Sequence, residues 1–287
     1  MPSPTVPTGN QSESDVLDVR ADVWQKRPLL REIYNRYFAE MITHFATVSG
    51  HRPLTTDHSF GTILELGGGS GNFKEYFLAH HPQQGTLIAS DIVPTRHCDL
   101  AADAMDLPFP DASLDNIIMQ DVLHHIPFPL RFFAEAQRTL RPGGRIIMTE
   151  PYISPFSRLV FKLAHPEPVD LRATLFADNS IQNSEFRIQN ISDPSPLRGT
   201  GAFASNQATP TLLFFRDLEK FNARFPHLQI KHRLRRSLLV YPLSGGFSGP
   251  KLLPRFLEPL AWAAEKYLTP LAPLLAFRLL VVIEKQK

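Results

Sequence analysis

The sequence has a single cysteine, Cys98, among 287 residues. One thiol excludes an intramolecular disulfide and a cysteine-based metal cluster, and it favours a reducing, cytosolic setting. Charge is also sparse, since charged residues make up 20% and the formal net charge is +2. The protein therefore has no strong overall positive electrostatic field that would attract nucleic acid. The most apolar stretch, 268–283, contains two prolines and an arginine and is shorter than the ~20 residues of a membrane span. We expect a cytoplasmic protein without a transmembrane helix.

The polar residues at the N-terminus contrast with the rest of the chain. Residues 1–17 are rich in Pro and Ser and lack the apolar centre of a signal peptide, which predicts a disordered tail. The remaining residues, 18–287, have an ordinary apolar content and a length that suits one large α/β domain.

Apolar periodicity predicts the elements of that domain. Steps of three and four residues predict a helix from Asp18 to Phe45. Short apolar runs predict strands at 62–66, 86–89, 116–119, 145–149, 228–241 and 277–283. Helices are predicted between the first and second of these strands and between the third and fourth, whereas the segment after Asp91 has hardly room for one. Alternating strands and helices predict a mostly parallel sheet with right-handed crossovers and an antiparallel last strand.

The strongest local signal is a glycine-rich turn directly after the first strand, where residues 63–73 read ILELGGGSGNF. Glycine lets the backbone pass close to a ligand, and the following helix presents free N–H groups at its start. A tight turn that binds nothing remains an alternative. A dinucleotide site would need G-x-G-x-x-G, but Asn72 or Lys74 takes the last position in the two possible registers.

The observed pattern, E-x-G-x-G-x-G, resembles the first motif of the class I S-adenosylmethionine-dependent methyltransferases. The match implies that Glu65 orients the loop and the methionine ammonium of the cofactor. It also implies that Gly67, Gly69 and Gly71 let the backbone pass under the amino-acid part of S-adenosylmethionine. A sulfonium nucleoside has no pyrophosphate, so the phosphate-binding geometry is not needed.

Three further segments resemble this family in the same order. Asp91 ends the second strand, where a carboxylate can bond the ribose hydroxyls, although a turn or cap residue is an alternative. Residues 102–109, ADAMDLPF, resemble the segment whose acid bonds adenine, which implies that Asp103 and Ala104 contact that ring. Residues 114–126 resemble the strand that ends beside the methyl group and place Gln120 at the cofactor. Residues 140–144, LRPGG, resemble the turn before strand five.

Methyl transfer requires a base only if the acceptor must lose a proton. His124 and His125 lie where the fourth strand opens into the site, and histidine suits proton transfer near neutral pH. We favour His125, which matches the position of a histidine in related enzymes that act on lipids. A structural histidine that bonds the backbone is the alternative. No convergent carboxylates are evident, so no metal is expected, and the signatures of DNA methyltransferases are missing from this sequence.

Two insertions, 151–210 and 244–275, are predicted to cap the cofactor-binding core at 62–150. Candidates for the pocket lining are Glu150, Tyr152, Arg158, His165, Glu167 and Tyr241. The basic run 231–236 predicts a solvated edge strand or an attraction to an anionic acceptor. The amphipathic segment 251–267 predicts a helix that packs on the core, closes over an acceptor or contacts a membrane surface.

The resemblance, over about 62–150, implies a Rossmann-like three-layer sandwich of the methyltransferase type 11 kind with cap insertions. It implies methyl transfer from S-adenosylmethionine to a small-molecule or lipid-like acceptor. A nicotinamide-dependent oxidoreductase on the same fold and a non-catalytic scaffold remain alternatives. We expect no nucleic-acid partner, and the sequence leaves the oligomeric state open.

Overall fold

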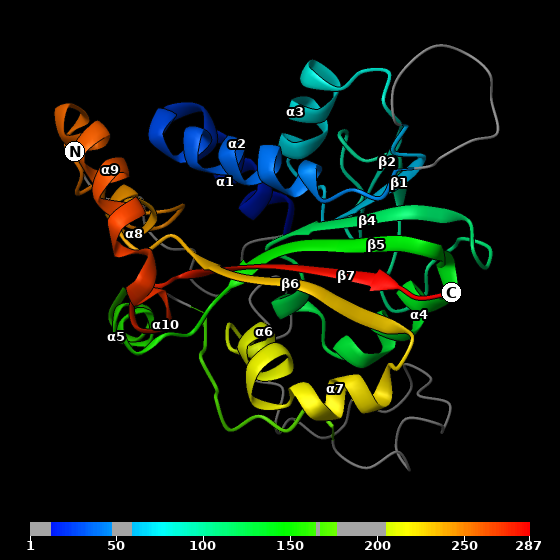
Figure 1. Cartoon of the computed structure of the whole chain (residues 1–287). Helices are drawn as coiled ribbons and strands as arrows, with labels where there is room; N and C mark the ends of the chain where they lie inside the picture. Colours follow the sequence, from blue (N-terminus) through cyan, green and yellow to red (C-terminus); the bar gives the residue numbers. More distant parts are fainter. Residues whose placement is uncertain (1–12, 48–58, 165–166, 177–204) are drawn as a thin grey trace.

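The computed structural model describes residues 13–47, 59–164, 167–176 and 205–287. Its centre is a seven-stranded sheet with the strand order β3-β2-β1-β4-β5-β7-β6 (Figure 1). The strands are β1 (Thr62–Leu66), β2 (Thr86–Asp91), β3 (Leu100–Ala101), β4 (Leu114–Gln120), β5 (Leu140–Pro151), β6 (Leu228–Arg236) and β7 (Arg278–Lys285). The first five run parallel, whereas β7 is antiparallel to both β5 and β6. The prediction of a mostly parallel sheet with an antiparallel last strand is confirmed.

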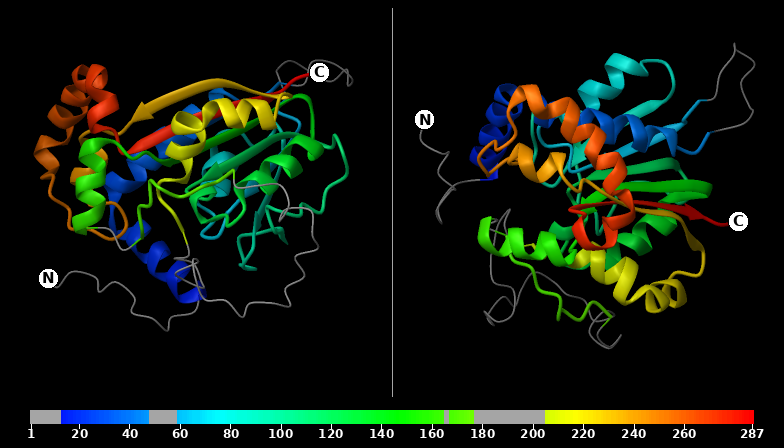
Figure 2. Two further views of the ribbon diagram at one scale, coloured as in Figure 1. Left: turned by 90° about the horizontal axis from the view of Figure 1, so that it is seen from below. Right: turned by 60° about the vertical axis from the view of Figure 1, so that its left-hand side comes forward.

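Helices cover both faces of the sheet (Figures 1 and 2). Successive side chains of a strand point to opposite faces, and Ile118 and Ile147 pack with one layer while Ile117 and Ile146 pack with the other. The first layer contains α2 (Pro28–Thr43), α3 (Asn72–His80) and α8 (Val240–Ser244). The second contains α4 (Pro129–Thr139), the short α6 (Thr209–Thr211), the π-helical turn η2 (Leu212–Arg216) and α7 (Leu218–Arg224). This is the Rossmann-like three-layer arrangement.

The N-terminal helix differs from the prediction. The structure divides it into α1 (Glu13–Lys26) and α2, and Pro28 occupies the first turn of α2. Proline lacks the N–H of a continuing helix and disfavours a helical conformation at Arg27, so the chain turns here. Helix α1 also begins before residue 18, so it includes part of the segment expected as a tail, and residues 1–12 lie outside the described residues.

The C-terminal third also differs in its boundaries. Strand β6 ends at Arg236 instead of continuing to Tyr241, because Ser237 has a positive φ of 60° and α8 follows. The basic run lies on β6 at the edge of the sheet, as the edge-strand interpretation expects. Its charges bind protein groups: Lys231 pairs with Glu284, Arg236 pairs with Glu40, and Arg235 stacks on Phe215. These contacts favour a structural role over an anion site.

The two predicted insertions contribute short helices beside the sheet. The first contains α5 (Pro155–Ala164), and residues 177–204 of it lie outside the described part. The second contains η3 (Arg255–Leu257), α9 (Glu258–Leu268), η4 (Thr269–Leu271) and α10 (Ala272–Leu275). Among the described residues, no helix combines the length and the apolar character that crossing a bilayer requires.

Candidate functional site

The glycine loop connects β1 to α3 at the carboxyl edge of the parallel strands. Gly67 and Gly71 have φ values of 74° and 75°, a region that side chains with a Cβ rarely adopt. A Cβ at Gly67 would lie 2.2 Å from a methyl carbon of Val122, and one at Gly71 would lie 2.7 Å from the His97 ring. The loop therefore requires glycine at both positions for its conformation and for its surroundings.

Glu65 lies on β1, two residues before this loop. Its side chain is buried, and Oε2 has no hydrogen-bond partner among the described residues. Burial raises the pKa of Glu65 to about 8; Lys74 opposes that rise and Asp91 adds to it. A buried carboxyl oxygen without a partner is costly, and a cationic ligand at this position would satisfy it.

Asp91 ends β2 and holds the glycine loop. Its Oδ2 accepts a hydrogen bond of 2.9 Å from the N–H of Gly69, and Oδ1 accepts one of 3.1 Å from Val93. The hydroxyl of Thr95 donates to the carbonyl of Gly69 from the same segment. Because a carboxylate offers about four lone-pair positions, Asp91 retains acceptor capacity for hydroxyl groups of a ligand.

The other predicted cofactor residues lie on two neighbouring segments. Oδ1 of Asp103 accepts a bond of 2.8 Å from the N–H of Met105, so the carboxylate shapes its own turn, and Ala104 packs against the core beside it. Gln120 ends β4 and donates to Asp121 at 3.0 Å, while its Oε1 has no partner in the described part of the chain. The carboxyl ends of β1, β2 and β4 are thus lined by polar groups with free acceptor positions.

The turn after β4 is fixed by Glu150 of β5. One carboxylate oxygen of Glu150 accepts bonds of 2.8 Å from the N–H groups of Val122 and Leu123, and the other lies 2.7 Å from Nδ1 of His124. Glu150 and His124 are both buried. The carboxylate therefore anchors η1 (Leu123–His125) at its first N–H groups and sets the orientation of the imidazole.

Glu167 approaches His124 from the opposite side. Its Oε2 lies 3.5 Å from Nε2 of His124 and accepts bonds from Ser205 and Gln207. Burial would lower the pKa of His124, but hydrogen bonds to Glu150 and Glu167 outweigh it and raise this pKa to about 9. His124 is therefore an imidazolium near neutral pH, and its charge attracts both carboxylates.

His125 has the opposite electrostatic character. Its ring lies 4.1 Å from that of His124, and burial, with the charge of His124 as a second cause, lowers the pKa of His125 to about 3. The His125 imidazole is therefore neutral over the physiological range. Ligand-type atoms of His124, His125 and Glu167 lie within 4.8 Å of one another, a grouping the sequence did not anticipate. Hydrogen bonds already engage His124 and Glu167 in this group.

A second buried pair lies beside the histidines, where Arg278 begins β7 and contacts Asp121. Both guanidinium NH groups lie 2.5 Å from carboxylate oxygens of Asp121. Burial would raise the pKa of Asp121, yet Arg278 lowers it to about 2. Asp121 also has a φ of 60°, a strained conformation for a residue other than glycine. The pair holds the strained turn after β4 in place.

Aromatic hydroxyls complete this cluster. Tyr34 of α2 donates to Asp121 at 2.8 Å and accepts from Arg278, whose guanidinium lies 4.7 Å from the centre of the Tyr241 ring. Burial and the charge of Asp121 raise the pKa of Tyr34. Helix α2 thereby contributes a polar group to the same cluster as β4 and β7.

The structure thus separates the predicted pocket residues. Glu150, Glu167 and Tyr241 belong to the cluster around His124 and Asp121. Tyr152 is buried in the core, where its ring packs against Phe215. Arg158 is exposed, and His165 lies outside the described residues. The sequence interpretation missed Arg278 and Tyr34. Arg278 stands in an otherwise apolar run, and a charge in such a run is a signal for a buried partner.

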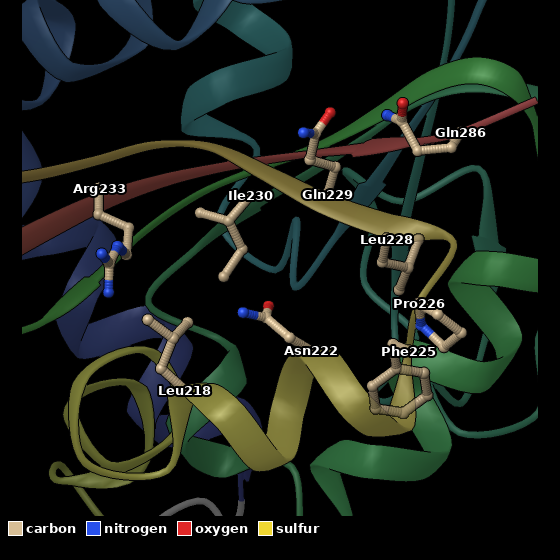
Figure 3. Close-up of a pocket in the computed structure, with 9 residues that line it drawn as sticks. All are labelled: Leu218, Asn222, Phe225, Pro226, Leu228, Gln229, Ile230, Arg233 and Gln286. Carbon is tan, nitrogen blue, oxygen red and sulfur yellow. The ribbon is translucent and has the colours of Figure 1, made fainter.

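A separate hollow of about 440 Å³ lies between α7 and β6, far from the glycine loop in the fold (Figure 3). Its lining is mixed, with Leu218, Ile230 and Phe225 beside Asn222 and Arg233. No predicted site residue lines it. Arg233 donates to the carbonyl of Phe214, so its charge is turned toward the protein.

Comparison with known proteins identifies relatives for the central segment. Residues 64–148 match the family model described as a methyltransferase domain. An uncharacterized methyltransferase of Mycobacterium avium (strain 104) is 32% identical over 114 residues, which are 36% of this chain and 45% of that protein. The 27-O-demethylrifamycin SV methyltransferase of Amycolatopsis mediterranei is 44% identical over 54 residues, or 19% and 20% of the two chains.

These matches cover less than half of each relative. A demethylmenaquinone methyltransferase of Tropheryma whipplei is 38% identical over 66 residues, which are 21% of this chain and 28% of that protein. Among solved structures, an S-adenosylmethionine-dependent methyltransferase from Archaeoglobus fulgidus superposes with a TM-score of 0.48 at 15% identity, over 89% of this chain and 94% of the other.

The Asp121–Arg278 pair predicts the effect of removing one charge. In Asp121→Asn, Arg278, whose side chain is 3% exposed, keeps a buried charge without its counter-ion. We expect the free energy of unfolding to fall by about 3 kcal/mol, measured by urea unfolding at pH 7. Asp22→Asn, which breaks an exposed pair with Lys26, should cost less than about 0.5 kcal/mol. Equal losses would mean that water already screens Arg278.

Proposed function

We propose that this chain, whose residues 64–148 match the model of a methyltransferase domain, is a class I enzyme that transfers a methyl group from S-adenosylmethionine to a small-molecule or lipid-like acceptor. The observation that carries the proposal is the open buried oxygen of Glu65 beside a glycine loop that admits no Cβ. S-adenosylmethionine carries an ammonium and a sulfonium, and both charges suit a carboxylate.

In this proposal the chain binds the cofactor through its own fixed groups. Glu65 faces the ammonium, and Gly67, Gly69 and Gly71 leave room for the amino-acid part. Asp91 accepts from the ribose hydroxyls, Asp103 and Ala104 contact adenine, and Gln120 lies beside the reacting end. When bound, the cofactor supplies an already activated methyl group, so the protein mainly orients the reactants and excludes water.

His125 and His124 take different roles in the proposed reaction. His125, neutral beside the imidazolium of His124, accepts a hydrogen bond from an acceptor hydroxyl. Because its lowered pKa makes it a weak base, it takes the proton only as the methyl group adds to the oxygen and then releases that proton to water. His124 positions that ring through its ion pair with Glu150. The insertions 151–210 and 244–275 cap the crevice, and a cytoplasmic location stays a prediction.

Two observations support the proposed class of acceptor. The relatives with a named acceptor act, by their names, on 27-O-demethylrifamycin SV and on demethylmenaquinone, neither of which is a macromolecule. The basic side chains of β6 are bound within the protein, so they do not form a free groove for nucleic acid. The proposal therefore retains a small or lipid-like acceptor.

Calorimetric titration distinguishes the proposal from a nicotinamide-dependent oxidoreductase. We expect S-adenosylmethionine and S-adenosylhomocysteine to bind and NAD not to bind, because the pyrophosphate would face Glu65 and Asp91. Asp91→Ala, which removes the acceptor for Gly69 and for the ribose, should weaken binding about tenfold or more. Binding of NAD without either sulfur ligand would reject the assignment.

The elevated pKa of Glu65 predicts a pH-dependent affinity. Below about pH 8 the carboxyl is mostly protonated and lacks the charge that attracts a cation. The affinity for S-adenosylmethionine should therefore rise with pH, relative to Glu65→Gln, by up to about tenfold per pH unit below the pKa. The comparison with Glu65→Gln removes the titration of the ligand's own amino group. A constant ratio between pH 6.5 and 9 would exclude Glu65 from contact with the ammonium.

The role of His125 is tested by separating turnover from binding. With an acceptor found by screening with labelled S-adenosylmethionine, His125→Ala should lower kcat about a hundredfold and leave cofactor affinity nearly unchanged. His80→Ala, an exposed histidine on α3, is the matched control. Lost cofactor affinity in His125→Ala would make the residue structural. Cofactor binding without transfer to any acceptor would favour a non-catalytic scaffold.

A further inference from the structure

Exposed apolar side chains gather on one part of the molecule. Ten of the fourteen large apolar residues that are exposed in the described part of the chain belong to α5 or to the segment 252–274. They are Phe156, Leu159, Leu163, Leu252, Phe256, Leu257, Leu260, Tyr267, Leu271 and Leu274. Monomeric proteins rarely expose so many apolar side chains in one region unless that region binds a partner or a membrane. We call the surface of these ten residues the apolar end face.

The elements that carry the apolar end face are neighbours in space. Helix α10 contacts α5, and η3 and η4 both contact α9. All of them lie at the end of the molecule that is at the left of Figure 1, and they stay together in both views of Figure 2. Residues nearly a hundred positions apart in the chain therefore contribute to one surface.

Helix α9 presents its apolar side outward. Ala261 is buried, and the Glu265 carboxylate faces the protein, where it accepts bonds of 3.1 and 2.7 Å from the N–H groups of Leu238 and Val240. Leu260 and Tyr267 are 66% and 83% exposed. Trp262 and Leu268 of the same helix pack against the core on its inner side. An ordinary surface helix exposes a polar side, whereas α9 also exposes large apolar residues. Packing of the predicted apolar side against the core, one of the sequence-based interpretations, is wrong for Leu260 and Tyr267.

A second contact fixes that orientation. The ring of Trp262, which follows Ala261, lies 4.0 Å from the Arg36 guanidinium of α2. Together with the bonds of Glu265, this stacking prevents α9 from rotating its apolar side inward without the loss of polar contacts. The outward apolar side is therefore a property of the folded chain.

The exposed charges of the same elements all have one sign. Exposed charged residues in α5 and in 251–275 are Arg158, Lys162, Lys251, Arg255 and Lys266. The two acidic residues there are half-buried: Glu258 pairs with Lys251 at 2.8 Å, and Glu265 bonds the backbone. An apolar strip bordered by cations is the pattern of a helix that lies in an anionic lipid surface.

The apolar end face adjoins the candidate site through the chain. Helix α5 begins four residues after the buried end of β5 at Pro151, and that strand carries Glu150. Helix α10 ends at Leu275, three residues before Arg278 of the pair with Asp121. Both connections lead from the exposed helices into the cluster of polar groups at the crevice.

We propose that the apolar end face docks this protein on an anionic lipid bilayer, with Phe256, Leu260 and Tyr267 among the acyl chains and Lys162 and Lys266 at the headgroups. Exposed positive charge lies on α5, η3 and α9 of the face, which argues for a lipid surface over a second copy of the same chain. A further step, that a lipid-like acceptor enters the crevice from this surface, rests on the proposed function.

Flotation with vesicles tests the docking without requiring an acceptor. The full chain should bind vesicles of phosphatidylcholine mixed with phosphatidylglycerol and should bind pure phosphatidylcholine weakly. The double variant Leu260→Ser/Tyr267→Ser should lower the bound fraction about tenfold. Leu78→Ser, which changes an exposed apolar residue on α3 outside the apolar end face, should bind as the unaltered chain does. Lys162→Glu/Lys266→Glu should remove the preference for the anionic lipid.

Equal binding by the chain and by Leu260→Ser/Tyr267→Ser, or no binding to the anionic vesicles, would overturn the proposal. Analytical ultracentrifugation tests whether a second copy of the chain binds the face instead. If the chain is a dimer and Leu260→Ser/Tyr267→Ser is a monomer, the face is a dimer interface. Circular dichroism verifies that the variants are folded. Calorimetry with S-adenosylmethionine is independent of lipid, so failure of the proposed activity and failure of docking give separate results.

Discussion

The ion pair between Asp121 and Arg278 joins parts of the chain that are 157 residues apart. Asp121 occupies a left-handed backbone conformation at the end of β4, and such a conformation costs about 1–3 kcal/mol. Arg278 compensates with both NH groups, and Tyr34 adds a bond from α2. Without this pair, the turn that carries both histidines would lose its support on one side. Glu150 supplies the support on the other side through the N–H groups of Val122 and Leu123.

The sequence predicted the features that depend on neighbouring residues. Strand β1, the glycine loop and the first turn of α3 follow one another within a dozen positions, and local periodicity was sufficient to place Glu65 and Asp91 at one edge of the sheet. Contacts between distant elements were not accessible in this way. The residues around Arg278 do not predict that β7 inserts between β5 and β6. Only that insertion brings the guanidinium of Arg278 to Asp121. The cofactor roles of Glu65, Asp91 and Asp103 stay predictions.

Periodicity also has a limit in helices. The spacing of α9 predicted one polar and one apolar face, but in the structure Leu260 and Tyr267 are exposed while Glu265 faces the protein. The side that meets the protein depends on tertiary contacts, here the bonds of Glu265 to the backbone of Leu238 and Val240. A similar limit applies at Pro28, where the apolar steps continue through the residue that breaks the helix. The sequence pattern indicates that a helix is amphipathic, whereas tertiary contacts determine which side of the helix faces the protein.

The position of β7 has a consequence for modularity. The segment recognised as a methyltransferase domain ends within β5. Strand β5 is nevertheless hydrogen-bonded along Arg145–Pro151 to β7, which begins 127 positions after β5 ends. A fragment that ends at residue 148 would expose Ile147 and the unpaired edge of β5, and an exposed edge strand can pair with another molecule. It would also lose the partner of Asp121. The segment that matches the family model is thus smaller than the unit that folds, and a graft of that segment onto another protein would lack the strand that pairs with β5.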